Sequence, residues 1–200
     1  MDSDFPMESD ATPTVAAAVS AYRRHANVAA LHEQLAIAAE AASVDELIAA
    51  AEPFRDIPEV TGPLYERVVA AQPNNARALV ILASAYWMAG RGPEAVGQLV
   101  ARALAADPHH QGAWHLWAIT EADPRDRMSR WQQVHKRFPA DELALAALAD
   151  NAASLAGAEH DPVALGIALD AYIELRKRAT LPEQQTALDN AISTLKNWKL

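Results

Sequence analysis

The 200-residue chain contains no cysteine, which excludes disulfide bonds, thiolate zinc sites and cysteine nucleophiles. Glycine is scarce, with 7 residues against 46 alanines, and a chain rich in alanine and poor in glycine favours helices. Basic residues are the minority charge, since 17 Lys and Arg stand against 26 Asp and Glu and give a net charge of −9. Polyphosphate and anionic membranes repel such a chain, so we expect no nucleic-acid partner.

Long hydrophobic runs are missing as well. The longest uncharged run in the middle of the chain covers residues 78–90, which is short of the roughly 20 residues that a membrane-spanning helix needs. The N-terminus carries Asp2, Asp4, Glu8 and Asp10, where a signal peptide would have a basic segment. We therefore expect a cytoplasmic protein without membrane insertion.

Helix signals cover nearly all of the chain. Ser43 and Glu46 have the spacing of a capping box, and Asp123 and Asp161 each precede a proline at a helix start. No run alternates long enough to predict a strand. The pattern predicts an all-α chain with helices at 14–25, 28–42, 44–54, 60–71, 75–89, 93–106, 111–122, 124–138, 141–156, 162–178 and 182–198.

The domain organisation follows from these segments. Residues 1–11 are acidic and predict a disordered leader. Residues 12–43 form an N-terminal helical pair that matches no known motif. Residues 44–200 form a repeat array, whose last helix, from about residue 182, has one apolar face and is predicted to cap the array.

The repeat is visible in the spacing of its prolines and large residues. Pro73, Pro108 and Pro139 close predicted helices at separations that bracket the 34 residues of a tetratricopeptide repeat (TPR). One stretch resembles a TPR almost position for position, with Leu79, Leu82, Ala83, Tyr86, Gly90, Glu94, Ala95, Leu99, Ala103, Asp107 and Pro108. Weaker matches begin at Leu47, Trp114 and Leu145. The resemblance implies a right-handed superhelix of antiparallel helix pairs.

The resemblance also implies a function, because TPR arrays generally hold a protein or peptide in a concave groove. We expect a non-catalytic scaffold or adaptor that binds a partner peptide or helix in an apolar groove. Carried over residue by residue, the groove is formed by Arg77, Val80, Ser84, Trp87, Met88, His115, Ile119, Leu143, Ala146 and Asp150. Trp87 is the best candidate for a binding hot spot. An alternative with equal weight is a groove filled by the chain's own helix 14–25 or by its capping helix.

A narrower resemblance concerns residues 103–118 and 130–134, which are similar to the TPR domain of cytochrome c biogenesis factors of the CycH/NrfG type. It implies an alternative function, a chaperone that handles apocytochromes during cytochrome c maturation. The export signal of that family is absent from the sequence.

Catalytic motifs are not found. The sequence has no H-E-x-x-H, G-x-S-x-G, P-loop or Rossmann pattern, so we expect no enzyme, no cofactor and no metal. An alternative is a helical-scaffold enzyme with a metal on His109, His110 and His115, the one histidine cluster with ligand-like spacing.

Two further features leave alternatives open. Five basic residues with interleaved aromatics lie between Arg125 and Arg137. We interpret them as the solvated side of an amphipathic helix, and docking of an acidic partner segment is the alternative. Open faces at the ends of the array also make self-association possible.

Overall fold

The computed structural model describes residues 11–199 and contains eleven α-helices, one 3₁₀ turn and no strand in that range. The predicted leader lies outside the described residues, except for Ala11, which opens the first helix. The helices are α1 (Ala11–His25), α2 (Val28–Glu40), α3 (Val44–Ala51), α4 (Pro58–Ala71), α5 (Ala76–Met88), α6 (Pro93–Ala106), α7 (Gln111–Ile119), α8 (Pro124–Arg137), α9 (Glu142–Glu159), α10 (Pro162–Arg178) and α11 (Pro182–Lys196).

The helix starts follow the predicted capping chemistry. The Ser43 hydroxyl accepts from the backbone N–H of Glu46, whose carboxylate accepts from the Ser43 N–H at 2.6 Å. Asp123 caps α8 and Asp161 caps α10, each followed by a proline that needs no hydrogen bond for its nitrogen. The all-α prediction is confirmed.

Several helix ends differ from the prediction for identifiable reasons. The helix expected at 44–54 changes to a 3₁₀ turn at Glu52–Phe54, where Pro53 has no N–H to continue the α-helical bonding. α7 ends at Ile119 instead of 122, because Asp123 takes the extended conformation that caps α8. α9 continues to Glu159 and is terminated by His160 in the left-handed conformation, at φ 52°.

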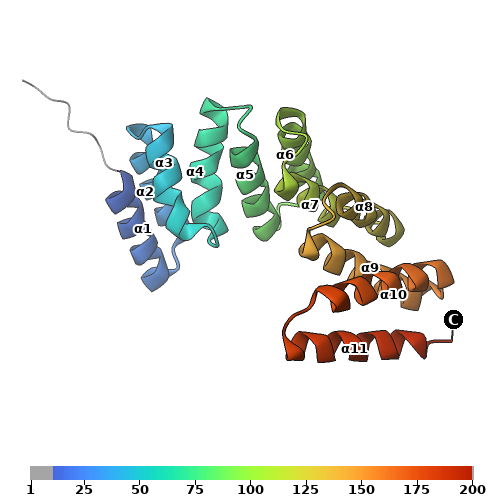
Figure 1. Cartoon of the computed structure of the whole chain (residues 1–200). Helices are drawn as coiled ribbons and strands as arrows, with labels where there is room; N and C mark the ends of the chain where they lie inside the picture. The colour runs from blue at the N-terminus through green and yellow to red at the C-terminus, as the bar shows by residue number, and fades with distance from the viewer. Residues whose placement is uncertain (1–10, 200) are drawn as a thin grey trace, which may run out of the picture. The chain divides into compact units, whose positions relative to one another are not determined.

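The described residues form two compact units, which divide between Leu116 and Trp117. In the first unit α1 packs against α2 and α3, α2 packs against α4, and α3 to α6 pack successively side by side (Figure 1). Its core is aliphatic around Tyr65, with Val19, Leu31, Leu64 and Leu79 buried. The division into an N-terminal pair and a repeat array stays a prediction.

In the second unit α9 lies between α8 and α10, and α10 also packs against α11. The buried positions of α9 and α10 are largely occupied by small side chains. These are the buried alanines 144, 149, 152 and 156 of α9 and 164, 168 and 171 of α10. Small side chains let two helix backbones approach closely, so this pair is the tightest contact of the unit.

Candidate functional site

The candidate partner-binding face in the first unit is one stripe of α5. Arg77, Val80, Ser84, Trp87 and Met88 recur at helical spacing on this stripe, and the other side of α5 is buried. Val80 and Ser84 are half-buried and Arg77 is exposed. Trp87 is 38% exposed and Met88 is 50% exposed. The helix therefore presents two large apolar side chains to solvent. We call the surface formed by all five residues of this stripe the α5 face.

Trp87 combines apolar area with an unused polar group. Within residues 11–199 its indole N–H has no hydrogen-bond partner, and more than half of its surface is covered by neighbours. An aromatic ring that is held on one side and open on the other is the usual form of an interface hot spot. Trp87 is therefore an aromatic side chain that is partly packed and partly exposed on the α5 stripe.

The C-terminal end of α5 is held in place by α4. The Tyr86 hydroxyl donates to Glu66 Oε1 at 2.8 Å, and Arg91 Nη1 lies 3.3 Å from the same oxygen. The Arg91 guanidinium also lies over the Tyr86 ring, 4.2 Å from its centroid. Burial raises the pKa of Tyr86, and its hydrogen bond to Glu66 adds to the effect. These contacts fix the backbone beside Trp87.

Toward the other end of the stripe, the start of α7 reaches α5 at Gly112. A Cβ added to Gly112 would lie 3.2 Å from Cγ1 of Val80 and 3.4 Å from Cε1 of His110. A larger residue at position 112 would need these side chains to move by a few tenths of an ångström, so the start of α7 is in close contact with Val80. The predicted groove residue His115, further along α7, is half-buried.

The remaining predicted groove residues belong to the second unit. Ile119 is 40% exposed at the end of α7, and Leu143 is 60% exposed in the first turn of α9. Asp150 accepts a hydrogen bond from the Tyr172 hydroxyl at 2.6 Å, so its carboxylate is already engaged. One groove that combines these residues with the α5 face stays a prediction.

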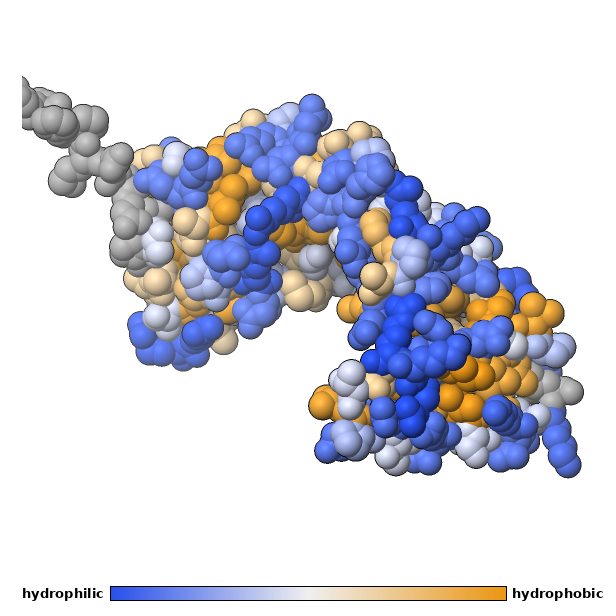
Figure 2. Space-filling view, in the orientation of Figure 1, coloured by the Kyte–Doolittle hydropathy of each residue, from blue (hydrophilic) through white to orange (hydrophobic). Residues whose placement is uncertain are grey.

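Ala146, the last predicted groove residue, opens into a pocket between α9, α10 and α11. The cavity has a volume of about 270 Å³. Figure 2 shows hydrophobic side chains gathered over α10 and α11 in this unit. The lining is mostly apolar and consists of Glu142, Ala146, Leu175, Ala179, Gln184, Ala187 and Leu188.

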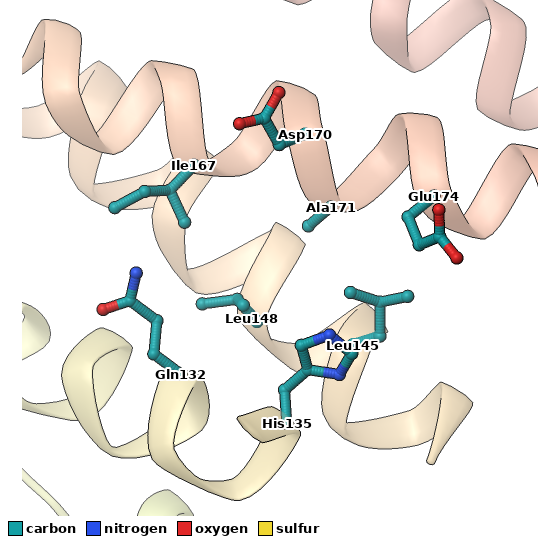
Figure 3. Close-up of a pocket in the computed structure, with 8 residues that line it drawn as sticks. All are labelled: Gln132, His135, Leu145, Leu148, Ile167, Asp170, Ala171 and Glu174. Carbon is teal, nitrogen blue, oxygen red and sulfur yellow. The ribbon is translucent and has the colours of Figure 1, made fainter. Parts of the chain in front are cut away.

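A second pocket in this unit was not foreseen from the sequence. It has a volume of about 250 Å³ and lies between α8 and α10, above α9 (Figure 3). Leu145 and Leu148 have the spacing of repeat packing residues, and nothing in that spacing indicates a gap beside them. We call this cavity the α8–α10 pocket. Its lining consists of Gln132, His135, Leu145, Leu148, Ile167, Asp170, Ala171 and Glu174.

The arginines of α8 are engaged within the unit. Arg125 contacts Glu159 at 2.5 Å and Asp161 at 2.8 Å. Arg127 Nε donates to Asn151 Oδ1 at 2.8 Å. These side chains therefore tie α8 to α9 and to the loop before α10, beyond the solvated role that was expected.

The third arginine, Arg130, has a similar role. It forms an ion pair with Glu121 and donates to the Trp117 carbonyl at 2.7 Å. Its guanidinium lies over the Trp117 ring, 4.7 Å from the centroid. The pKa of Glu121 is held below its usual value, first by a hydrogen bond from the backbone N–H of Asp123 and also by the positive charge of Arg130. The Arg137 guanidinium also lies over the Phe138 ring, 5.9 Å from its centroid, so at least four of the five basic residues have intramolecular partners.

The histidine cluster does not form a ligand set. The backbone N–H of His109 donates to Asp107 Oδ1 at 2.9 Å, in the turn before α7. Across residues 11–199 no three His, Cys, Asp or Glu side chains are grouped so that they could hold a metal ion. The alternative of a metal on His109, His110 and His115 thus finds no geometric support. No helix in the same range has the length and apolarity needed to cross a membrane.

Comparison with known proteins identifies the fold. No protein-family model matches the chain, and no curated protein matches it in sequence. One crystal structure of MamA superposes with a TM-score of 0.60 at 16% identity, over 79% of this chain and 94% of its own. A second MamA structure superposes with a TM-score of 0.59 at 15% identity, over 86% of this chain and 99% of its own. TTC0263, a thermophilic TPR protein of Thermus thermophilus, superposes with a TM-score of 0.57 at 15% identity, over 94% of this chain and 100% of its own. These similarities do not test the narrower resemblance to cytochrome c biogenesis factors.

Proposed function

The chain has the fold of the tetratricopeptide-repeat proteins, and we propose that it is a non-catalytic interaction scaffold that binds a protein partner through the α5 face. The observation that carries the proposal is the exposure of Trp87 and Met88 on a helix whose opposite side is buried. Contiguous exposed apolar surface is typical of interaction sites, and these two adjacent side chains supply the exposed apolar area of the face.

The chemistry of the face indicates the kind of partner. Apolar contact comes from Val80, Trp87 and Met88. The Ser84 hydroxyl donates a hydrogen bond to the Val80 carbonyl at 2.9 Å, and Arg77 is the one charged residue of the stripe. Such a face suits the apolar side of an amphipathic helix or a hydrophobic peptide. The methionine thioether adapts to irregular partner surfaces, and the fixed indole provides a rigid anchor.

A self-filled groove is the competing explanation. In the first unit α1 packs against α2 and α3, and Trp87 and Met88 keep their exposed area with α1 in that position. This arrangement favours an external partner over α1 as the occupant of the α5 face.

The proposal is tested by site-specific photo-crosslinking in the native cell. A p-benzoylphenylalanine at position 88 reports on the α5 face, and the same residue at position 37 is the matched control, because Ile37 is similarly exposed on α2. We expect one partner to be crosslinked from position 88 and not from position 37. Trp87→Ala should lower the yield at position 88 about fivefold or more, as loss of a hot-spot aromatic costs more than about 1 kcal/mol of binding.

Ile37→Ala provides the second control and should leave the crosslink at position 88 unchanged. Circular dichroism of both alanine variants establishes that their helices are retained. Equal adducts from positions 37 and 88, or a yield that does not respond to Trp87→Ala, would contradict the proposal.

A further inference from the structure

The helix pair formed by α1 and α2 lies at one end of the first unit (Figure 1). One side of the pair is covered, because α1 packs against α3 and α2 packs against α4. On α2 the buried residues Leu31, Leu35 and Ala38 recur at helical spacing. Ile37 lies on another side of the same helix and is 53% exposed. The pair therefore leaves a large apolar side chain in contact with solvent.

The exposed side of the pair consists of one stripe from each helix. The residues of each stripe recur at helical spacing and are exposed or half-buried. We call the two stripes together the α1–α2 face, which consists of Ala17, Ala21 and Arg24 of α1 and Ala30, Glu33 and Ile37 of α2. Ala21 and Ala30 line the same hollow between the two helices, so the stripes lie side by side.

The charges of the α1–α2 face have both signs and are unpaired. Arg24 and Glu33 are exposed, and neither has an ion-pair or hydrogen-bond partner within residues 11–199. Residues 11–42 contain two arginines, two glutamates and no lysine or aspartate, so this pair is close to neutral in a chain of net charge −9. A face with an unpaired positive charge on one helix and an unpaired negative charge on the other is complementary to itself.

We propose that the α1–α2 face binds the same face of a second copy of this chain, in a two-fold symmetric dimer. A two-fold axis parallel to the helices places α1 of each copy over α2 of the other. The two helices are joined by two residues and run antiparallel, so that Ile37, nine residues after the start of α2, is level with Ala17, eight residues before the end of α1. The small alanine side chain leaves room for the isoleucine of the second copy.

The same arrangement brings Arg24 of each copy to Glu33 of the other. Arg24 lies one residue before the end of α1, and Glu33 lies five residues after the start of α2. This difference is an offset of about 6 Å along the helix axes. Side chains lean toward the N-terminus of their own helix, so the arginine and the glutamate lean toward each other and close the offset. Each dimer contains two such ion pairs.

The α1–α2 face is separate from the α5 face, so this inference does not depend on the proposed function. A crosslink from position 37 to a second copy of the chain differs in mass from a crosslink to another protein. Position 37 therefore still serves as the control for position 88, and failure of either proposal leaves the other standing.

The test is sedimentation equilibrium of the full chain at concentrations from about 10 μM to 1 mM, where small interfaces associate. We expect a reversible equilibrium between monomer and dimer. Arg24→Glu and Glu33→Arg each place like charges opposite one another at two points of the dimer, and each should weaken it about tenfold. Ile37→Ala should weaken it about fivefold through the loss of buried apolar area.

The decisive sample is an equimolar mixture of Arg24→Glu and Glu33→Arg. In the mixed dimer both ion pairs are attractive again, so the mixture should associate about as tightly as the wild type. Such a rescue requires both variants to be folded, which excludes unfolding as the cause of the weaker association.

Arg67→Glu is the matched control, because it makes the same change of charge at an exposed site of α4 and should leave the dimer unchanged. A chain that stays monomeric over the whole range would overturn the proposal. So would single variants that dimerise like the wild type, a mixture that associates no better than its two components, or an Arg67→Glu variant that is weakened as much as Arg24→Glu.

Discussion

The indole ring of Trp198 lies directly against Gly157, so that a Cβ added to the glycine would be 3.1 Å from Cη2 and 3.2 Å from Cζ3 of the ring. Trp198 follows α11 and Gly157 belongs to the last turns of α9. The contact therefore fastens the C-terminal end of the described chain to α9, and a Cβ at position 157 would need the indole to move by a few tenths of an ångström.

This contact predicts that the effect of Gly157→Ala on the stability of the chain depends on whether Trp198 is present. Alanine in place of a helical glycine stabilises by about 0.5–1 kcal/mol through its higher helix propensity. We expect Gly157→Ala to stabilise the chain by that amount only when Trp198 is also replaced by alanine. In the wild-type background the methyl group must displace the indole, which offsets the gain. Urea unfolding of the two single variants and the double variant measures this coupling, and additive free energies would rule out the contact.

A second prediction concerns acid. The pKa of Asp161 is held below its ordinary value, first by the backbone N–H of Ala164 and then by its hydrogen bond to Arg125. A depressed carboxyl pKa stabilises the folded chain above the unfolded pKa, and the contribution disappears as the pH falls through the folded pKa. We therefore expect stability to fall on acidification below about pH 4, and to fall less steeply in Asp161→Asn.

The measurement for Asp161 is thermal unfolding at a series of pH values, with Asp126→Asn as the control. Asp126 lies in the neighbouring first turn of α8 and is exposed. A pH slope in Asp161→Asn that equals the wild-type slope would show that the carboxylate is not coupled to folding.

A third prediction concerns the ionisation of Tyr172 at alkaline pH and the effect of its hydrogen-bond partner Asp150. Burial raises the pKa of Tyr172, and the hydrogen bond to Asp150 raises it further. A raised phenol pKa stabilises the folded chain below the unfolded value of about 10 and is lost as the pH rises through the folded pKa. In an ultraviolet titration of the folded protein, Tyr172 should therefore ionise after an exposed tyrosine would, as should Tyr65 and Tyr86, whose pKa values are also raised.

The variant Asp150→Asn separates the two causes. Removal of the carboxylate charge should lower the pKa of Tyr172 only in part, because burial remains the larger cause. The difference between the titration curves of the wild type and of Tyr172→Phe identifies the contribution of Tyr172 to the late ionisation. A titration curve of Asp150→Asn that superposes on that of the wild type would exclude the contribution of Asp150.

The fold was predictable because its signals are local. A cap such as Ser43 with Glu46, or an Asp-Pro pair such as Asp161 and Pro162, determines where a helix begins from residues that are adjacent in sequence. The stripe of Arg77 to Met88 follows in the same way from helical periodicity, which places spaced residues on one side. Helix ends were less accurate where a following segment imposed its own conformation, as Asp123 does at the end of α7.

The contacts between distant residues could not be predicted from one sequence. Periodicity places Arg125 and Arg127 on the outside of α8, and it does not reveal that Glu159 and Asn151 lie opposite them. The α8–α10 pocket has the same origin, because it depends on the separation of two helices that both pack on α9. No local pattern in His135 or Asp170 encodes that separation.

The alanines that join α9 to α10 have a consequence for the entropy of folding. An alanine side chain has no rotamers to lose when it becomes buried, whereas a leucine or isoleucine loses about 0.5–1 kcal/mol of side-chain freedom. The seven buried alanines of α9 and α10 therefore contribute their packing without that cost. Ordering of α9 against α10 is opposed mainly by the loss of backbone freedom.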